Sequence, residues 1–242
     1  MAPATAAVHS WRILSAYRLP HALRVSICFT KDVVNHPPPA TVLINPCNER
    51  LSGTHAFSYF PRGGPVPPTS PPGMERQSVN WGGMDAGENM LYPAQTVDGL
   101  VGIAGGPAQS AQLAAISKCP TGHAVSTAAT GTLARHFERI VHTATPFYAS
   151  PKWELQLRAC YMHSLSIATK AAKSETTIAT PILGAGCKGI PVEDAVGAAA
   201  DACRAWDAAN PGSRAHLIVA IQDPSLHTLL RAAFQTCGCD SS

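Results

Sequence analysis

The stretch TTIATPILGAGCKGIPVED, residues 176–194, predicts a strand–turn–helix unit, because a β-branched run passes there into a glycine-rich turn and then into a helix beginning near Pro191. Proline suits a first helical turn, and Glu193 and Asp194 suit the positive end of the helix dipole. A glycine-rich turn that enters a helix points backbone N–H groups at one spot and so forms an anion site. The sequence therefore predicts a phosphate-binding loop at residues 184–189, with a purely structural turn as the alternative.

The letters GAGCKG in this turn also match the G-x-G-x-x-G pattern of nicotinamide-binding domains. In such domains an acidic residue follows about 20 residues later, at the end of the next strand. Asp223 lies well beyond that spacing, so a nicotinamide-dependent oxidoreductase is only a distant alternative. No G-K-[ST] sequence occurs in the chain, which excludes a nucleotide-hydrolysing P-loop.

Outward from this stretch, strands and helices alternate along the chain. Short runs rich in β-branched residues predict strands at residues 23–30, 41–45, 140–144, 176–183 and 217–221. Apolar residues at helical spacing predict helices at residues 151–173, 191–209 and 225–234, and a further Ala/Gly-rich helix opens at residue 97. Continuous apolar strands suit burial on both faces, so the pattern predicts a three-layer α/β domain.

Composition narrows the possible classes of function. With 45% hydrophobic and 14% charged residues, the chain as a whole is neither disordered nor a coiled coil. No run approaches the ~18 consecutive apolar residues of a membrane-spanning helix. The formal net charge of +3 is too small to indicate a polyanionic partner. We therefore expect no membrane and no specific nucleic acid among the partners.

Two segments stand apart from the alternating pattern. No acidic residue precedes Asp32, while arginines recur among Ala and Ser, which predicts a basic N-terminal arm at residues 1–21, with a mitochondrial transit peptide as the alternative. Residues 55–96 are rich in Pro and Gly and too long for an ordinary loop. We interpret them as an insertion within the domain, and their aromatic residues indicate that part of it packs against the rest.

The eight cysteines are scattered among apolar and turn residues of a chain too large to need disulfides. Only Cys237 and Cys239 are close in sequence, and a Cys-x-Cys pair without a second ligand pair is weak evidence for zinc. We therefore expect reduced thiols, no metal and an intracellular protein, cytoplasmic or nuclear. The acid-free N-terminus leaves a mitochondrial location open.

Two further polar motifs lie at element boundaries. Asn45-Pro-Cys-Asn48 follows directly after a predicted strand, and Asp98 opens a predicted helix after the insertion. Asparagine at strand ends commonly builds turns, and aspartate before a helix is ordinarily a cap. Each motif alone is therefore ordinary, and only their order together with the loop at residues 184–189 indicates a function.

Taken in order, these motifs resemble those of the macrodomain family. The segments that carry the likeness are NPCNERLSG at 45–53, VDGLVGIAGGP at 97–107, CPTGHAV at 119–125, IVHT at 140–143 and GAGCKGIP at 184–191. The likeness covers about residues 24–234 apart from the insertion, and it is greatest to the MacroD-type branch of ADP-ribosyl hydrolases. It implies one macrodomain over residues 1–242, an α/β/α sandwich with a mixed central sheet.

The resemblance also implies an activity: removal of mono-ADP-ribose from acidic side chains of proteins and deacetylation of O-acetyl-ADP-ribose, by a monomer without a cofactor. Asp98 and Asn48 would be the catalytic residues, with Asp98 orienting water and Asn48 holding the distal ribose. Asp32 would accept a hydrogen bond from the adenine amino group. The other implied ligand-binding residues are Val33, Asn45, Gly99, Gly184, Ala185, Gly186, Cys187, Lys188, Gly189, Ile190 and Ile221.

The sequence departs from the family pattern at positions that bear on catalysis. Of the glycines that lead into Val-Asp-Gly, only Gly53 remains before the insertion, and Gly82 and Gly83 are candidate replacements. Gly102 stands where the family has a helix histidine, and Ile221 stands where an aromatic residue stacks on adenine. A non-catalytic ADP-ribose reader is therefore the alternative function.

Overall fold

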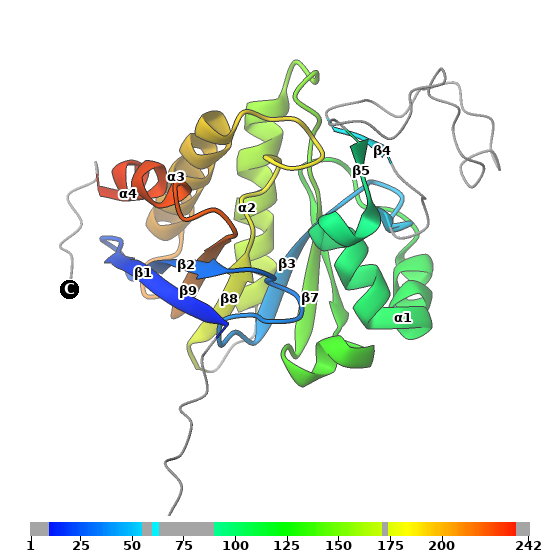
Figure 1. Ribbon diagram of the computed structural model, residues 1–242. Helices are drawn as coiled ribbons and strands as arrows, with labels where there is room; N and C mark the ends of the chain where they lie inside the picture. Colours follow the sequence, from blue (N-terminus) through cyan, green and yellow to red (C-terminus); the bar gives the residue numbers. More distant parts are fainter. Residues whose placement is uncertain (1–9, 55–59, 63–89, 171–173, 236–242) are drawn as a thin grey trace, which may run out of the picture.

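Five parallel strands form the centre of a seven-stranded sheet in the computed structural model, which describes residues 10–54, 60–62, 90–170 and 174–235 (Figure 1). Most of their residues are buried, as the continuous apolar runs predict. In spatial order they are β2 (Arg24–Thr30), β9 (Ala215–Ile221), β8 (Thr176–Thr180), β3 (Val42–Cys47) and β7 (Arg139–Ala144).

An antiparallel strand lies at each edge, so the sheet is mixed. β6 (Ala124–Ala128) pairs with β7, and β1 (Trp11–Arg18) pairs with β2. The basic arm predicted for residues 1–21 is therefore wrong for residues 11–18, which are a strand. The reason is that Tyr17 is buried and stacks on Phe234 with ring centroids 6.1 Å apart, while the arginines of β1 remain exposed.

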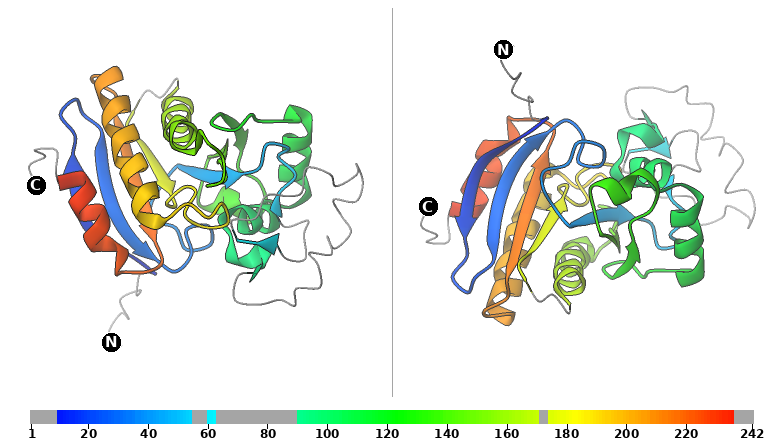
Figure 2. Two further views of the ribbon diagram at one scale, coloured as in Figure 1. Left: turned by 90° about the horizontal axis from the view of Figure 1, so that it is seen from above. Right: turned by 90° about the horizontal axis from the view of Figure 1, so that it is seen from below.

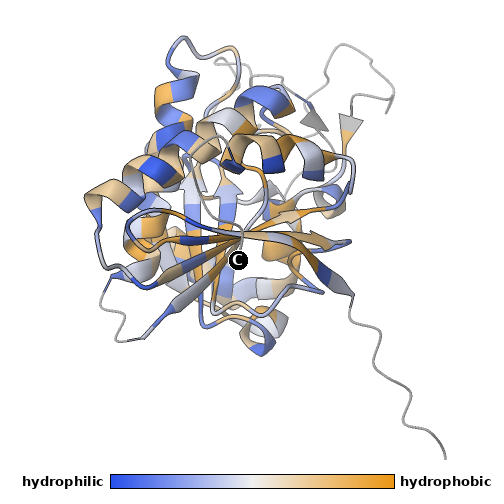
Figure 3. Cartoon of the chain, turned by 90° about the vertical axis from the view of Figure 1, so that its left-hand side faces the viewer, coloured by the Kyte–Doolittle hydropathy of each residue, from blue (hydrophilic) through white to orange (hydrophobic). Residues whose placement is uncertain are grey.

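Helices cover both faces of this sheet, which confirms the predicted three-layer fold (Figure 2). The helices α2 (Trp153–Thr169), α3 (Val192–Ala209) and α4 (Leu226–Gln235) pack on one face, and α1 (Val97–Ile116) and the 3-10 helix η4 (Gly131–Arg135) pack on the other. Side chains of β3 alternate accordingly: Val42 and Ile44 face α2 and α3, and Leu43 faces α1. Figure 3 shows that the strands carry mostly hydrophobic residues between these layers.

The helix α1 begins after a short 3-10 turn, η3 (Pro93–Gln95), and it is interrupted in the middle. Gly106 has a φ of 63° and Pro107 follows it, so the helical path breaks there. Asp98 in the first half and Gln109 in the second half are both buried. The helix therefore presents two polar side chains to the interior of the domain.

The insertion predicted at residues 55–96 is described only near its two ends. Phe60–Pro61, strand β4, pairs antiparallel with Met90–Leu91, strand β5. The two ends therefore lie next to each other. Trp81, Gly82 and Gly83, which bear on our interpretation of the insertion, lie outside the described residues.

Three findings bear on the broad class of the protein. In the part of the chain that the structure describes, no helix is long and apolar enough to cross a membrane. In the same ranges no three His, Cys, Asp or Glu side chains are grouped as metal ligands. The six cysteines found there are all free, and burial raises the pKa of the Cys203 thiol to about 12.

Candidate functional site

The parallel strands end at one edge of the sheet, and the candidate site is built from the segments that follow them (Figures 1 and 2). Ligands of α/β proteins bind at the carboxyl ends of such strands. The segments in question follow β2, β3, β7 and β8, at residues 31–36, 48–54, 145–150 and 181–190. Most residues of the predicted site come from these segments and from the start of α1.

The loop at residues 184–190 presents a run of backbone donors. Among the described residues, the N–H groups of residues 185–188 donate no hydrogen bond to another residue. Gly184 has a φ of 81°, and a Cβ there would lie 2.6 Å from Ile190 Cδ1, so only glycine fits. A Cβ at Gly186 would meet nothing within 4 Å, so the loop is open at that point. This arrangement suits the predicted phosphate-binding role.

Lys188 brings a positive charge into the same loop. Its side chain is largely buried, and its Nζ lies 3.9 Å from the centroid of the Phe147 ring, which is a cation–π contact. Its backbone carbonyl accepts a hydrogen bond from the Tyr148 N–H at 3.1 Å, which joins the loops after β7 and β8. Lys188 forms no ion pair with any described residue, so its charge is available to an anionic ligand.

The charges that act on the thiols of Cys47, which is buried, and Cys187, which is half-buried, indicate that the start of α1 and the loop after β8 meet at one site. Burial raises the pKa of Cys47 well above its usual value, the charge of Asp98 raises it further, and the charge of Lys188 lowers it. Burial also raises the pKa of Cys187, with Lys188 lowering it and Asp98 raising it. A carboxylate and an ammonium group therefore lie close to both thiols.

Asp98 itself is held by two donors from the segment containing β3. Asn45 Nδ2 donates to Asp98 Oδ1 at 2.8 Å, and the Thr54 N–H donates to Asp98 Oδ2 at 2.9 Å. Thr54 Oγ1 lies 3.1 Å from Thr96 Oγ1, and Thr96 caps α1 by accepting from the Gly99 N–H at 3.1 Å. The carboxylate is thus fixed at the start of α1. The N–H of Gly99, a predicted ligand-binding residue, donates to this cap.

Asn48 lies in a tight turn directly after β3. Its Oδ1 accepts from the Arg50 N–H at 3.1 Å and from the Ser52 N–H at 3.3 Å. Within the described ranges its Nδ2 has no partner, so this donor is available to a ligand. The predicted role of Asn48 in holding a ribose hydroxyl is compatible with this geometry.

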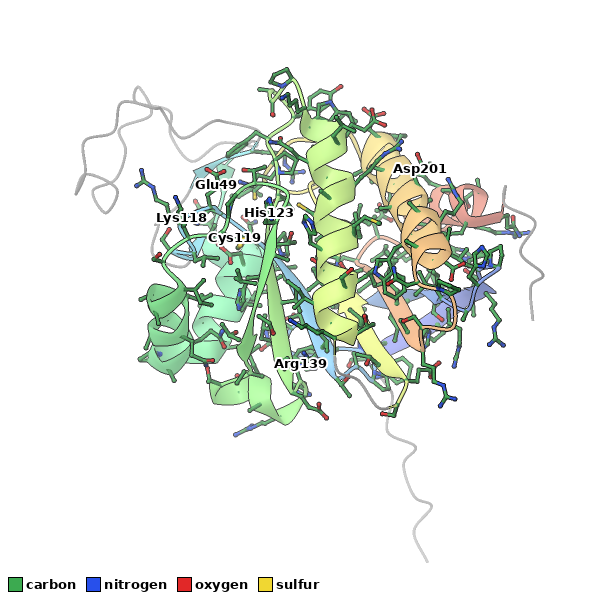
Figure 4. All side chains as sticks on the ribbon, turned by 180° about the vertical axis from the view of Figure 1, so that it is seen from behind. Glu49, Lys118, Cys119, His123, Arg139 and Asp201 are labelled. Atoms are coloured by element: carbon green, nitrogen blue, oxygen red, sulfur yellow. The ribbon has the colours of Figure 1, made fainter. Side chains whose placement is uncertain are left out.

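The turn that carries Asn48 is tied to the segment before β6. Glu49 lies next to Cys119, whose N–H donates to the Glu49 carbonyl at 2.8 Å (Figure 4). The Glu49 Oε1 accepts from the hydroxyl and the N–H of Thr121, at 2.6 and 3.0 Å. These two hydrogen bonds lower the pKa of Glu49. These contacts hold the turn in place and do not involve the side-chain amide of Asn48.

Asp32, predicted to bind adenine, organises the turn after β2. Its Oδ1 accepts from the N–H groups of Val34 and Asn35 at 2.8 and 3.0 Å, and its Oδ2 accepts from Asn35 Nδ2 at 2.6 Å. A carboxylate oxygen has two lone pairs, so Oδ2 keeps one for an adenine amino group. Asn35 is a partner of Asp32 that the sequence interpretation missed.

Three of the predicted ligand contacts have their side chains in the hydrophobic core. Ile221 ends β9 and faces α2, α3 and α4, and Ile190 belongs to the same cluster. Val33 packs in the cluster on the α1 side. The side chain of Ile221 is only 2% exposed, so it offers no platform for adenine in this structure.

A buried polar cluster beneath Asp98 was also missed by the sequence interpretation. His142 Nδ1 lies 3.1 Å from Asn45 Nδ2, and His142 Nε2 lies 2.9 Å from Thr127 Oγ1. Gln109 Nε2 donates to the same Thr127 oxygen. No local sequence signal reveals it, because it depends on the register that pairs Asn45 with His142 and on the turn of α1 that places Gln109 on its inner side.

Comparison with known proteins agrees with this architecture. The Macro domain family matches residues 85–199. A Macro domain-containing protein of Caldanaerobacter subterraneus is 33% identical over 118 residues, which are 46% of this chain and 65% of the relative. The match thus spans about two thirds of that relative's length.

Solved macrodomain structures share the fold. The Oceanobacillus iheyensis macrodomain with ADP superimposes with a TM-score of 0.64 at 16% identity, over 93% of this chain and 96% of that one. The Trypanosoma brucei macrodomain in complex with ADP-ribose gives a TM-score of 0.57 at 18% identity, over 85% and 68%. The fold is therefore that of a macrodomain. The Macro domain family model matches residues 85–199, slightly less than half of the chain.

Proposed function

We propose that this chain binds ADP-ribose along the carboxyl edge of its sheet. The loop at residues 185–188 offers backbone N–H groups and Lys188 adds a positive charge, which suits a pyrophosphate. Asp32 offers an acceptor that suits the adenine amino group. The macrodomains of O. iheyensis and T. brucei, solved with ADP and with ADP-ribose, support this proposal by their shared fold.

The order of the three candidate subsites carries the proposal. Across the sheet, β2 leads to Asp32, β8 leads to the donor loop, and β3 leads to Asn48 and holds Asp98 through Asn45, with β9 between β2 and β8. Neighbouring strands lie about 4.8 Å apart, so the three subsites spread over roughly 14 Å. ADP-ribose has its base, its diphosphate and its distal ribose in this order.

We further propose a MacroD-type reaction at the distal ribose, in which water cleaves the ester to an acidic side chain or to acetate and releases ADP-ribose and the carboxylic acid. Asp98 accepts protein hydrogen bonds on both oxygens, and these bonds hold the carboxylate in place to orient a water or a ribose hydroxyl. Asn48 Nδ2 supplies a donor from the turn after β3. The substrates of this proposed reaction are mono-ADP-ribosylated proteins and O-acetyl-ADP-ribose.

A non-catalytic ADP-ribose reader is the second candidate, and one observation favours it. Asp98 is 7% exposed and both its oxygens already bond to protein donors. Such a carboxylate orients a water less freely than an open one.

The test is calorimetric titration with ADP-ribose, followed by a release assay on a protein carrying mono-ADP-ribose on its glutamates. The hydrolase requires binding, release by the wild type, and loss of release in Asp98→Ala with binding kept. Binding without release identifies the reader. Absence of binding overturns the proposal and revives the nicotinamide alternative, which fluorescence of the reduced cofactor would then test.

A further inference from the structure

Asn45 uses its hydrogen-bonding groups unevenly. Its side chain is fully buried, and its Nδ2 donates to Asp98 Oδ1 at 2.8 Å and to His142 Nδ1 at 3.1 Å. Its Oδ1 is buried with no partner. An unpaired buried carbonyl oxygen costs about 1–3 kcal/mol. The orientation of this amide is therefore set by its two neighbours.

These neighbours allow one arrangement of hydrogens. A carboxylate only accepts, so Asp98 requires the amide nitrogen of Asn45 to face it. An amide nitrogen only donates, so His142 must present an unprotonated Nδ1. The imidazole hydrogen is then on Nε2, which lies 2.9 Å from Thr127 Oγ1.

The reversed amide would break the contact with Asp98. It would place Asn45 Oδ1 against the carboxylate, where two oxygens repel, and it would pair with a His142 that carries its hydrogen on Nδ1. Thr127 favours neither form, because its hydroxyl can accept from or donate to Nε2, so the contact with Asp98 decides between them. Burial lowers the pKa of His142 to about 4, which removes the doubly protonated form at neutral pH.

We propose that His142 is a positioning residue for Asp98: the imidazole, with its hydrogen on Nε2, fixes the Asn45 amide so that its nitrogen faces the carboxylate. This inference rests on the proposed function, in which Asp98 orients the attacking water or a ribose hydroxyl. His142 is fully buried and reaches Asp98 only through Asn45. Thr127 lies at the far side of the ring, and Gln109 Nε2, 3.3 Å from His142 Nε2, donates to the Thr127 hydroxyl and not to the ring.

The first test reads the hydrogen position and needs no substrate. Nitrogen-15 NMR of the histidines in the full chain, from pH 8 to pH 5, should show His142 as the Nε2–H tautomer throughout. An Nδ1–H tautomer, or protonation with a midpoint near 6.5, overturns the inference.

The second test uses two variants that each imitate one ring nitrogen. His142→Asn places an oxygen near the position of Nδ1 and keeps an acceptor for Asn45, whereas His142→Gln reaches toward the position of Nε2 and leaves Asn45 without one. We expect His142→Asn to keep kcat within about threefold and His142→Gln to lose at least about tenfold, with KM within about twofold in both. Equal losses, or a loss confined to KM, overturn the inference.

A control covers the case in which neither variant folds. Thr127→Val removes the acceptor at Nε2 with almost no change of shape. We therefore expect kcat to fall while KM stays unchanged. An unchanged kcat overturns the inference that His142 positions Asp98. Failure of the proposed function gives a different result. A wild type that neither binds nor releases ADP-ribose refutes the reaction, and the NMR measurement still decides the hydrogen arrangement.

Discussion

Asn45 Nδ2 donates to Asp98 Oδ1 at 2.8 Å across 53 positions of the sequence. Asn45 belongs to β3 and Asp98 to the first turn of α1, and the whole insertion lies between them. Because this contact is buried, it ties the start of α1 to the sheet directly. The position of the carboxylate therefore depends on β3.

Two glycines of the donor loop should respond differently to substitution. Gly186→Val adds a side chain where nothing lies within 4 Å, so the fold should stay intact while the side chain blocks the N–H groups. We expect at least a tenfold loss of ADP-ribose affinity (about 1.4 kcal/mol or more) with an unchanged melting temperature. Calorimetry and thermal unfolding measure both quantities.

The matched control for this prediction is Gly184→Ala. Its Cβ would clash with Ile190 at a positive φ, so this variant should unfold at a lower temperature. If Gly186→Val bound ADP-ribose as tightly as the wild type, the loop would not hold the diphosphate.

Asp32→Asn should shift the preference of the site from adenine towards hypoxanthine. The asparagine oxygen can still accept from the N–H groups of Val34 and Asn35, so the turn should survive. Its amide nitrogen, however, repels the adenine amino group, and we expect ADP-ribose to bind more weakly by about 1–3 kcal/mol. The hypoxanthine analogue has an acceptor at that position and should bind the variant better than the wild type. Equal affinities of both proteins for both ligands would contradict the adenine assignment.

Lys188→Met should weaken binding mainly through charge. The ammonium over Phe147 has no acidic partner among the described residues, so its loss removes attraction to the diphosphate. We expect a loss of about 1 kcal/mol or more at low salt and a flatter dependence of Kd on ionic strength. Lys170→Met, at the far end of α2, is the control and should behave as the wild type. An unaltered salt dependence in Lys188→Met would remove Lys188 from the ligand site.

His142 should make the protein less stable in mild acid. Its pKa is about 4 in the fold and 6.5 in the unfolded chain, so between these values the unfolded state binds more protons. The free energy of unfolding therefore falls as the pH falls through 6.5 towards 4, by roughly 2 kcal/mol at pH 5. The pKa of His216 is also lowered, chiefly by burial, and acts in the same direction.

Urea unfolding at pH 7 and pH 5 measures this effect. His142→Asn lacks the titrating ring, so the difference between the two pH values should shrink by roughly 2 kcal/mol. A variant with the same difference as the wild type would show that His142 is protonated normally in the fold.

The core of the fold could be predicted because its strands are continuous apolar runs in the sequence. The run of β9 is apolar nearly throughout, and a strand buried on both faces needs no partner information to be recognised. The edge strand β1 was missed because exposed arginines interrupt it and its single buried side chain, Tyr17, is fixed by a contact with α4. β8 ends at Thr180, earlier than predicted, since Pro181 cannot donate to the ladder.

The site residues that lie in sequence motifs could be predicted. Those that join the site through contacts between distant parts of the chain could not. The glycines of the donor loop and Asp98 lie in ordered motifs of the sequence. His142 and Gln109 join the site only because the register sets His142 beside Asn45 and because α1 turns Gln109 inward. Neither the register nor the orientation of α1 follows from local sequence, so the role of His142 could not be predicted.

The pairing of Phe60–Pro61 with Met90–Leu91 closes the base of the insertion. Shortening the chain between them threefold would change the entropy of loop closure by only about 1 kcal/mol. This base therefore accommodates insertions of other lengths at a small entropic cost, while Asp98 stays anchored to β3.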